Sequence, residues 1–326
     1  MAAFTGRPQF RGPGDGGHLR DRDVSRQAPA QGADHGGALG RRRPGGVRGS
    51  AAFALIAAAS GAYWVLVLIA GLRRLHPRPL PDVLPAPGVS VLKPRQAIEP
   101  GLEEALRSHA RQDYPQFEVL CDSASLRSPN PKVGVLAALA RRARYPVLVV
   151  NDADITVSPE YLRRVVAELE QPGVGLVTCL FRARGLSWPA RFEALAVSTE
   201  FAPGVLVARL LGIGDFALGA TMALRARDLD RIGGFGAVGD YLADDYWLGR
   251  KISGLGLKVA LSREVVETRL TAETWRDAWR HQVRWARTVR VSRPGGYRGY
   301  LATHATLWAL AAALAGAWPA AAFAFA

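Results

Sequence analysis

Cysteine is scarce in this chain of 326 residues, which contains only Cys121 and Cys179, each inside an apolar, strand-like run. Two separated cysteines form neither a disulfide framework nor a zinc-binding pattern, so a reducing compartment is expected. Acidic residues are also few, 28 against 42 basic ones, which gives a formal charge of +14. That charge favours a negative partner: a phosphate compound, an anionic lipid or a nucleic acid. Because 49% of the residues are hydrophobic, the chain is able to bury a sizeable core.

Charge is missing altogether from two long segments. Residues 51–72 are uncharged and reach the length of about 20 apolar residues that a bilayer core requires, with a buried core helix as the alternative. Residues 301–326 carry no Asp, Glu, Lys or Arg. They are expected to hold a second membrane segment, kinked or ended by Pro319 and truncated at the C-terminus. With two such segments, nucleic acid is the weakest of the three partners and is not expected.

Arginines flank the first uncharged segment on both sides, so the positive-inside rule leaves its orientation open. They are Arg41, Arg42, Arg43 and Arg48 before it, and Arg73, Arg74 and Arg78 after it.

The rest of the chain divides by composition. Residues 1–50 show no periodicity and read as a disordered basic leader, and residues 73–88 form a proline-rich linker. Residues 89–300 form the main domain, in which β-rich runs alternate with helical stretches and predict a mostly parallel α/β sheet. Ligands of such sheets bind beyond the carboxyl ends of the strands. Strands are expected at 89–92, 117–121, 147–150 and 174–180, and helices at 101–112 and 159–170.

Two acidic pairs are candidates for chemistry. Asp152 and Asp154 directly follow the apolar run VLVV and are suited to hold a hard divalent cation, Mn²⁺ or Mg²⁺, that neutralises a sugar diphosphate. A helix cap or a solvated loop is the alternative. Asp244 and Asp245 are adjacent, so repulsion predicts that one has a raised pKa or a cationic partner, as suits a general base. An exposed helix N-terminus is the alternative there.

A third candidate is the segment 271–290, which is rich in arginine and tryptophan. Thr274 and Asp277 have the spacing of a capping box. The pattern suits a helix at the headgroup level of a membrane or one that grips a diphosphate, with a plain solvated helix as the third reading. One helical face would carry Arg276, Arg280, Arg284 and Arg287, and the adjacent face Trp275 and Trp279.

Taken in order, these motifs resemble the ceramide glucosyltransferase family, and more closely its bacterial relatives that glycosylate hopanoid lipids. The likeness runs from Val89 to Arg290 and is specific because the motifs keep their order and spacing. HQVRW resembles the family's Q/R-x-x-R-W signature, with His281 at its first position. The other matching stretches are VSVLKP, EPGLEEALRSHARQDYPQFEVL, NPKVGVLAAL, VNDADI, GDFALGATMALRARDLDRIGGF and YLADDYWLGRKI.

The resemblance implies a GT-A-type α/β fold and inverting transfer of a hexose, glucose or N-acetylglucosamine, from a UDP-sugar to a lipid hydroxyl. It further implies a ceramide or hopanoid acceptor, a divalent metal, and a membrane protein with at least two spans whose catalytic domain is cytosolic. Asp245, beside Asp244, is the implied base, and Asp152 and Asp154 are the implied metal ligands. Implied donor contacts are Asp122, Lys132, Asp152 and Arg284, and implied acceptor contacts are Trp285, His281, Gly219 and Met222.

The chain departs from the family after Cys121. The family continues there through an aspartate-rich stretch and a further β-α unit before reaching the NPK motif, whereas FEVLCDSASLRSPNPK crosses this distance in a few residues. Asp122 stands in for the family's first aspartate, and Val135 occupies a position where the family tends to place Asn. Part of the uridine site is therefore expected to be missing. A catalytically impaired membrane paralogue is the alternative to an active transferase.

Overall fold

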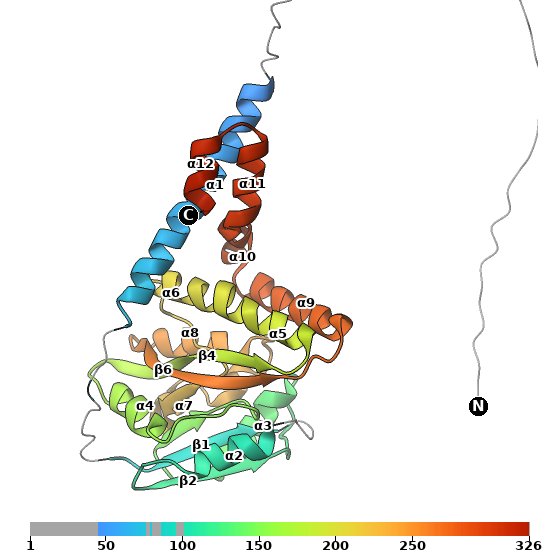
Figure 1. Ribbon diagram of the computed structural model, residues 1–326. Coiled ribbons are helices and arrows are strands. Elements are labelled where there is room, and N and C mark those ends of the chain that lie inside the picture. Colours follow the sequence, from blue (N-terminus) through green and yellow to red (C-terminus); the bar gives the residue numbers. More distant parts are fainter. Residues whose placement is uncertain (1–44, 76–78, 80–85, 96–100, 326) are drawn as a thin grey trace, which may run out of the picture. The chain divides into compact units, whose positions relative to one another are not determined.

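The computed structural model describes residues 45–75, 79, 86–95 and 101–325, so most of the predicted leader and linker lie outside the described residues. The centre of the domain is a six-stranded sheet with the order β2-β1-β3-β5-β4-β6 (Figure 1). The strands are β1 (Val89–Pro94), β2 (Phe117–Asp122), β3 (Val147–Val150), β4 (Val174–Gly185), β5 (Met222–Arg225) and β6 (Lys258–Leu270).

One strand runs against the others. β1 pairs in parallel with β2 and β3, and β4 with β6, whereas β5 is antiparallel to both of its neighbours, β3 and β4. The predicted, mostly parallel α/β sheet is therefore confirmed, and the expected runs are β1 to β4. Because β5 is reversed, its first residue, Met222, pairs with Val150 at the carboxyl end of β3. The loop that enters β5 thus reaches the edge where ligands bind.

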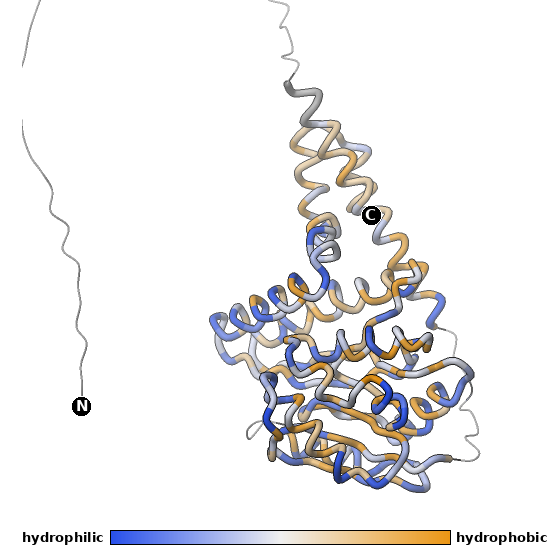
Figure 2. The backbone as a smooth tube through the Cα atoms, turned by 180° about the vertical axis from the view of Figure 1, so that it is seen from behind, coloured by the Kyte–Doolittle hydropathy of each residue, from blue (hydrophilic) through white to orange (hydrophobic). Residues whose placement is uncertain are grey.

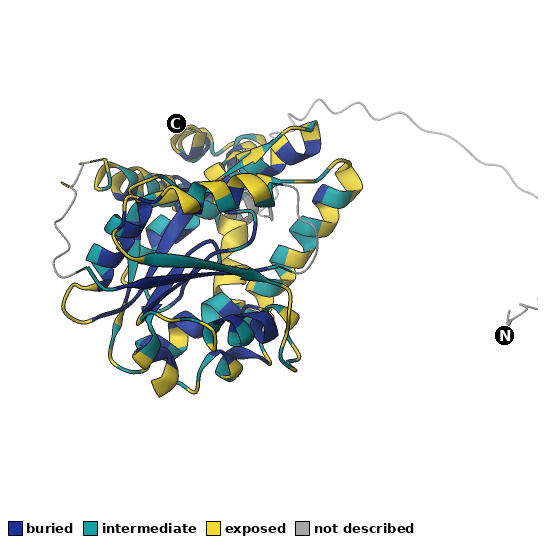
Figure 3. Ribbon diagram, turned by 90° about the horizontal axis from the view of Figure 1, so that it is seen from below, coloured by how far each residue is buried: buried dark blue, intermediate teal, exposed yellow. Residues whose placement is uncertain are grey.

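Helices cover both faces of the sheet. The predicted helices are α2 (Leu102–Ala110) and α4 (Tyr161–Leu169). α4 packs its buried side chains on one face, and α3 (Pro131–Ala140), α7 (Ala226–Arg231) and α8 (Asp244–Ser253) pack on the other. Figure 3 shows the central strands and the inner faces of the helices as the buried part of the domain. Each fully buried Val or Leu contributes about 1.5–3 kcal/mol to this arrangement.

A second group of helices packs on β4 and on its neighbour β6. α5 (Trp188–Ala196) packs on β4 and runs through a π-helical turn, η1 (Val197–Phe201), into α6 (Ala202–Leu210). α9 (Trp275–Ser292) packs on α5 and begins at the predicted capping box. The Thr274 side chain accepts a hydrogen bond from the backbone N–H of Asp277, and the Asp277 side chain accepts one from the backbone N–H of Thr274. Shorter elements are η2 (Phe235–Val238), α10 (Pro294–Tyr300) and η3 (Leu301–Thr303).

The first uncharged segment lies in α1 (Gly45–Leu72). Its part Ser50–Leu72 is the one helix, within the described ranges, that is long and apolar enough to cross a membrane. Only 17% of its most apolar stretch is buried, which argues against a core helix. Figure 2 shows α1 and the two C-terminal helices as predominantly hydrophobic tubes.

The second uncharged segment forms two short helices, α11 (Ala305–Leu314) and α12 (Trp318–Phe325), rather than one long helix. Both pack on α1, closely enough that a Cβ added at Gly61 would lie 2.7 Å from the Phe323 ring. The chain turns at Gly316, whose φ of 79° favours glycine. Pro319 is only the second residue of α12, so the predicted break lies before the proline.

Candidate active site

Asn151, the first residue after β3, is fully buried and fixes the loop that carries Asp152. Its side-chain amide donates to the Tyr161 hydroxyl at 3.0 Å and to the Ala220 carbonyl at 2.8 Å. Its Oδ1 atom lies 3.2 Å from His109 Nε2. Burial lowers the pKa of His109 to about 3, so this ring is neutral near pH 7. Asn151 therefore fixes where the chain leaves β3.

Lys93, on β1, fixes the same loop from the other side. Its fully buried ammonium donates to the carbonyl oxygens of Asp152 at 3.0 Å and Ile155 at 3.1 Å. Sequence reasoning missed both Lys93 and Asn151. The available signal was a lysine inside the apolar strand VSVLKP and an asparagine between VLVV and the acidic pair. Polar residues in such places need specific partners, because an unpaired buried charge is costly.

Lys132 lies beside Asp152 of the first acidic pair and beside both members of the second. Its Nζ lies 2.7 Å from Asp152 Oδ1 and 3.6 Å from Asp244 Oδ2. Burial by itself lowers the pKa of Lys132, but the charges of Asp152, Asp244 and Asp245 outweigh burial and raise the pKa above its usual value. We call Lys132, Asp152, Asp244 and Asp245 the acid–lysine cluster. Its ammonium is therefore charged at neutral pH.

Asp245 is fixed by two backbone amides. Its Oδ2 accepts from Gly219 N at 2.8 Å and its Oδ1 from Tyr246 N at 2.7 Å. Burial, followed by the charge of Asp244, raises the pKa of Asp245 to about 6, against the opposing effect of the Lys132 ammonium. The prediction that the adjacent pair has a raised pKa or a cationic partner is confirmed on both counts, since Lys132 is that partner. The pair also forms the first turn of α8, a helix N-terminus as in the alternative, but Asp244 is buried there and not exposed.

Gly219 lies at the centre of the cluster. A Cβ added there would stand 3.3 Å from Asp152 Oδ2, 3.3 Å from Asp245 Oδ2 and 3.4 Å from Lys132 Nζ. This close approach follows from the reversal of β5, which brings the loop before Met222 to the carboxyl end of β3. Met222 itself is fully buried between β3 and β4, so its side chain belongs to the core.

The start of α3 explains the position of Lys132. Asn130 caps α3 by accepting from Lys132 N at 3.1 Å, and Pro131 occupies the first turn. The Asn130 amide also donates to the Tyr241 carbonyl at 3.0 Å, which ties the helix start to the loop that enters α8. The lysine of the NPK motif is thus placed beside Asp244 by its own cap residue.

The structure gives Asp152 and Asp154 different partners. Asp154 accepts from the Thr268 hydroxyl of β6, and burial raises its pKa. Within the described part of the chain, no three His, Cys, Asp or Glu residues gather into a metal-binding group. The Asp152 side chain is 41% exposed, however, and a hard cation needs only one or two carboxylates when phosphate and water supply its other ligands. The donor set therefore fits Mg²⁺ or Mn²⁺.

Asp122 is not part of the acid–lysine cluster. The register sets Leu120 and Val150 level on either side of Leu92, so Asp122 and Asp152 lie two strands apart, about 10 Å. Asp122 accepts from the backbone N–H groups of Ser123 and Ala124 and pairs with Arg142 at 2.5 Å. The Ala124 amide, and then Arg142, lower its pKa. Residues 123–130, which follow, contain no helix or strand.

The signature HQVRW lies on α9, against α5, η1 and β4. The Trp285 ring centroid is 4.7 Å from that of His281, 6.2 Å from Phe201 and 6.5 Å from Phe181. Arg284 is exposed. No described contact joins these side chains directly to the acid–lysine cluster. The connection is apolar: Phe201 packs on a buried cluster that includes Leu218, the neighbour of Gly219, and Tyr246, the neighbour of Asp245, packs on the same cluster.

An α/β sheet with an Asp-x-Asp loop and the acid–lysine cluster beyond its carboxyl edge is the arrangement of a GT-A-type glycosyltransferase. The Glycosyl transferase family 21 model matches residues 51–127 and 120–326, and the chain belongs to this family. The predicted GT-A-type fold and the ceramide glucosyltransferase family are therefore confirmed, and sugar transfer is the family's reaction. The closer likeness to relatives that glycosylate hopanoids stays a prediction.

The chain is similar to known glycosyltransferases in sequence and in fold. Ceramide glucosyltransferase 1 of Caenorhabditis elegans is 27% identical over 228 residues, 61% of this chain and 48% of the relative. Ceramide glucosyltransferase 3 of the same species is 26% identical over 211 residues, 54% and 45% of the two chains. The chain thus spans about half the length of these relatives. A mannosyltransferase from Pyrobaculum calidifontis, solved with GDP-Man and Mn²⁺, shares 21% identity at a TM-score of 0.49, over 83% of this chain and 85% of that one.

Proposed function

We propose that the chain is an inverting hexosyltransferase that moves glucose or N-acetylglucosamine from a UDP-sugar to the hydroxyl of a membrane lipid, a ceramide or a hopanoid. The observation that carries the proposal is Asp245, a partly buried carboxylate with a raised pKa that faces Lys132 and Asp152 at the ligand-binding edge of the sheet. The ceramide glucosyltransferases among its relatives support the lipid acceptor.

Asp245 is the proposed general base. With a pKa raised to about 6, it is ionised at neutral pH yet more basic than an ordinary aspartate. The two backbone amides from Gly219 and Tyr246 hold its orientation. It takes the proton of the lipid hydroxyl, whose oxygen attacks the anomeric carbon as the bond to the diphosphate breaks on the opposite side. The configuration at that carbon inverts.

Negative charge develops on the departing UDP, so cations are needed at the diphosphate. Lys132 is placed to contact the diphosphate from within the acid–lysine cluster, and Arg284 is proposed to reach it from α9. Asp152 and Asp154 would hold a divalent cation, which supplies Lewis-acid stabilisation of the leaving group when bound. Asp122 is proposed to contact the nucleoside side of the donor, at the neighbouring position along the sheet edge.

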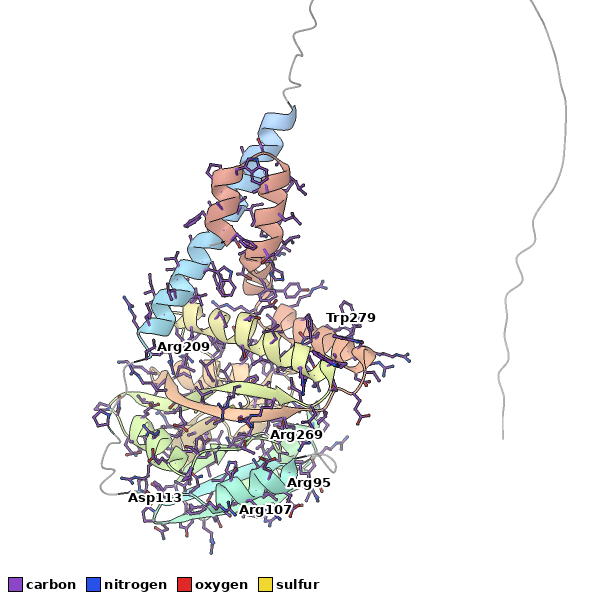
Figure 4. The ribbon with its side chains drawn as sticks, in the orientation of Figure 1. Arg95, Arg107, Asp113, Arg209, Arg269 and Trp279 are labelled. Carbon is purple, nitrogen blue, oxygen red and sulfur yellow. The ribbon has the colours of Figure 1, made fainter. Side chains whose placement is uncertain are left out.

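The acceptor is proposed to arrive from a membrane, with the domain on its cytosolic side. α1 supplies the anchor, and α9 lies at headgroup level with Trp275 and Trp279 exposed by 60% and 70%. Figure 4 shows the position of Trp279 on α9. Trp285 and His281 line the path of the lipid, and Gly219 lets the acceptor approach the base closely. Met222 is fully buried in the core and packs beneath the loop that carries Gly219.

An impaired paralogue is the second candidate. The family model matches in two stretches that meet at residues 120–127, and the connection from β2 to α3 there is a short loop. Binding of UDP by the purified chain separates the candidates, because a transferase needs a donor site and the impaired paralogue lacks one.

Lipid mass spectrometry on cells with and without the gene tests the function itself. We expect a hexose-bearing lipid that disappears with the gene and returns with the intact chain but not with Asp245→Asn. Identical lipid profiles, in a chain shown to bind UDP, would contradict a lipid acceptor.

A further inference from the structure

α5 carries a carboxylate in an interior position. Glu193 is 2% exposed, its Oε1 lies 2.7 Å from His281 Nδ1, and it accepts from Gln282 Nε2 at 3.1 Å. Its Oε2 is buried without a hydrogen-bond partner among the described residues. Burying a carboxylate in this way costs stability, and an apolar side chain of similar size would pack between α5 and α9 at a lower cost.

The groups that Glu193 holds belong to the Q/R-x-x-R-W-like signature. His281 is its first residue and Gln282 its second, so both hydrogen bonds fix the first half of the motif on α9. The His281 ring in turn contacts the ring of Trp285, the last residue of the motif. A single carboxylate on α5 therefore sets the rotation of α9 about its axis where the signature begins.

Trp285 transmits this placement toward the acid–lysine cluster. It contacts Phe201 of the π-helical turn, and Phe201 packs on the apolar cluster that contains Leu218, against which Tyr246 also packs. Those two residues adjoin Gly219 and Asp245. Trp285 and the proposed base, Asp245, are thus connected through side chains that pack on the same apolar cluster.

We propose that Glu193 is a positioning residue for the acceptor side of the site: it holds His281 and Gln282 and, through His281, the ring of Trp285. The inference rests on the proposed function, in which Trp285 lines the path of the lipid. Because Glu193 is buried, it acts through these side chains and does not touch the substrate.

Three variants of the full chain in detergent test this role. Glu193→Leu removes Oε1, the atom that contacts both His281 and Gln282, and puts an apolar side chain in its place, whereas Glu193→Gln retains one amide oxygen as acceptor. Glu273→Gln removes the same charge from an exposed residue just before α9 and serves as the matched control. We expect the KM for the lipid to rise about tenfold in Glu193→Leu, as for the loss of a buried hydrogen bond to a charged group. The KM for the UDP-sugar and kcat should change less than about twofold.

Partial rescue and coupling distinguish positioning from a general loss of stability. The KM for the lipid in Glu193→Gln should lie between the values for the unaltered chain and for Glu193→Leu. In the Glu193→Leu, His281→Ala double variant, this KM should be no higher than in the single variant with the higher value. Fully additive losses would overturn action through His281. Equal rises in the KM values for donor and acceptor would overturn a role on the acceptor side.

Amide hydrogen exchange of residues 275–285 provides a readout that needs no turnover. It should be about tenfold faster in Glu193→Leu than in Glu273→Gln. If no variant, nor the unaltered chain, transfers sugar, the proposed function fails and exchange alone decides the positioning role. Equal exchange in these two variants would then overturn it.

Discussion

Replacing Asp245 by Asn should abolish transfer without destabilising the protein. The proposed reaction needs the carboxylate as a base, so the rate should fall by at least about 10²-fold. Binding of UDP should persist, because Lys132 and Asp152 keep their ion pair of 2.7 Å. The unusual part of the prediction is the stability, which follows from the burial of this carboxylate.

The magnitude comes from opposing contributions. Burial raises the pKa of Asp245 from 3.8 to about 6, so keeping it ionised at neutral pH costs about 3 kcal/mol of folding stability. Asn removes this cost but, with one oxygen, keeps only one of the two bonds from Gly219 N and Tyr246 N, a loss of about 1–3 kcal/mol. Lys132 also loses one of three nearby charges. The net change should therefore stay within about 2 kcal/mol of zero.

The pH dependence gives the sign of the effect. The folded protein binds the proton of Asp245 more tightly than the unfolded chain does, so this carboxylate adds stability at low pH. That contribution is lost as the pH rises from about 4 to about 6. Relative to the unaltered protein, Asp245→Asn should thus gain about 1.4 kcal/mol between pH 5.0 and pH 7.5. Transfer by the unaltered chain should fall about tenfold per pH unit below about pH 6.

Thermal unfolding in detergent at the two pH values is the assay. The difference in Tm, Asn variant minus unaltered chain, should increase by about 2–4 °C from pH 5.0 to pH 7.5. Asp240→Asn, an exposed aspartate near the start of α8, is the control and should show no such trend. A Tm difference that is constant or shrinks over this range would refute the argument from burial. Transfer that survives the substitution would remove Asp245 as the base.

Three further predictions concern the metal, the membrane and the short loop. UDP binding should require Mn²⁺ or Mg²⁺ and fail in chelator, and the Asp152→Asn, Asp154→Asn double variant should lose this metal dependence; metal-independent binding by the intact chain would leave the pair a structural role. The chain should need detergent for release from membranes, and deletion of residues 51–72 should weaken attachment, whereas full recovery of the intact chain in a salt wash would contradict the anchor. A family-like insert between Ser123 and Pro129 should restore UDP binding before turnover if the loop impairs the donor site; titration of both forms with UDP checks this, and equal affinity would show the insert to be dispensable.

The sheet was partly predictable because its first four strands are apolar runs. Such runs locate β1 to β4 without tertiary information, and the carboxyl-end rule then indicates Asp152 as a site residue. β5 has only four residues and β6 alternates irregularly across a register shift, so neither gives a clear pattern. The reversal of β5 brings Gly219 to Asp245. It arises only when the strands pair in the sheet, so no short stretch of sequence predicts it.

Residues that act through distant partners could not be predicted. Lys132 meets Asp244 because Asn130 bonds to Tyr241, a contact across 111 positions of the chain. Glu193 lies in the sequence WPARFEALA, where its neighbours give no sign that it is buried against α9. The capping box at Thr274, by contrast, is local and is confirmed. A local motif such as this capping box can thus be predicted from the sequence. The contact of Lys132 with Asp244 cannot, because it depends on how whole helices and strands pack.

The configuration of the product tests the central claim most directly. The purified chain, with Mn²⁺, a UDP-α-hexose and a ceramide or hopanoid acceptor, should release UDP and form a lipid hexoside in equal amounts. Nuclear magnetic resonance of the isolated lipid should show a β-linked hexose, as single displacement with inversion requires. An α-linked product would contradict the proposed displacement by the lipid hydroxyl activated at Asp245. UDP release without any lipid-linked sugar would contradict the lipid acceptor.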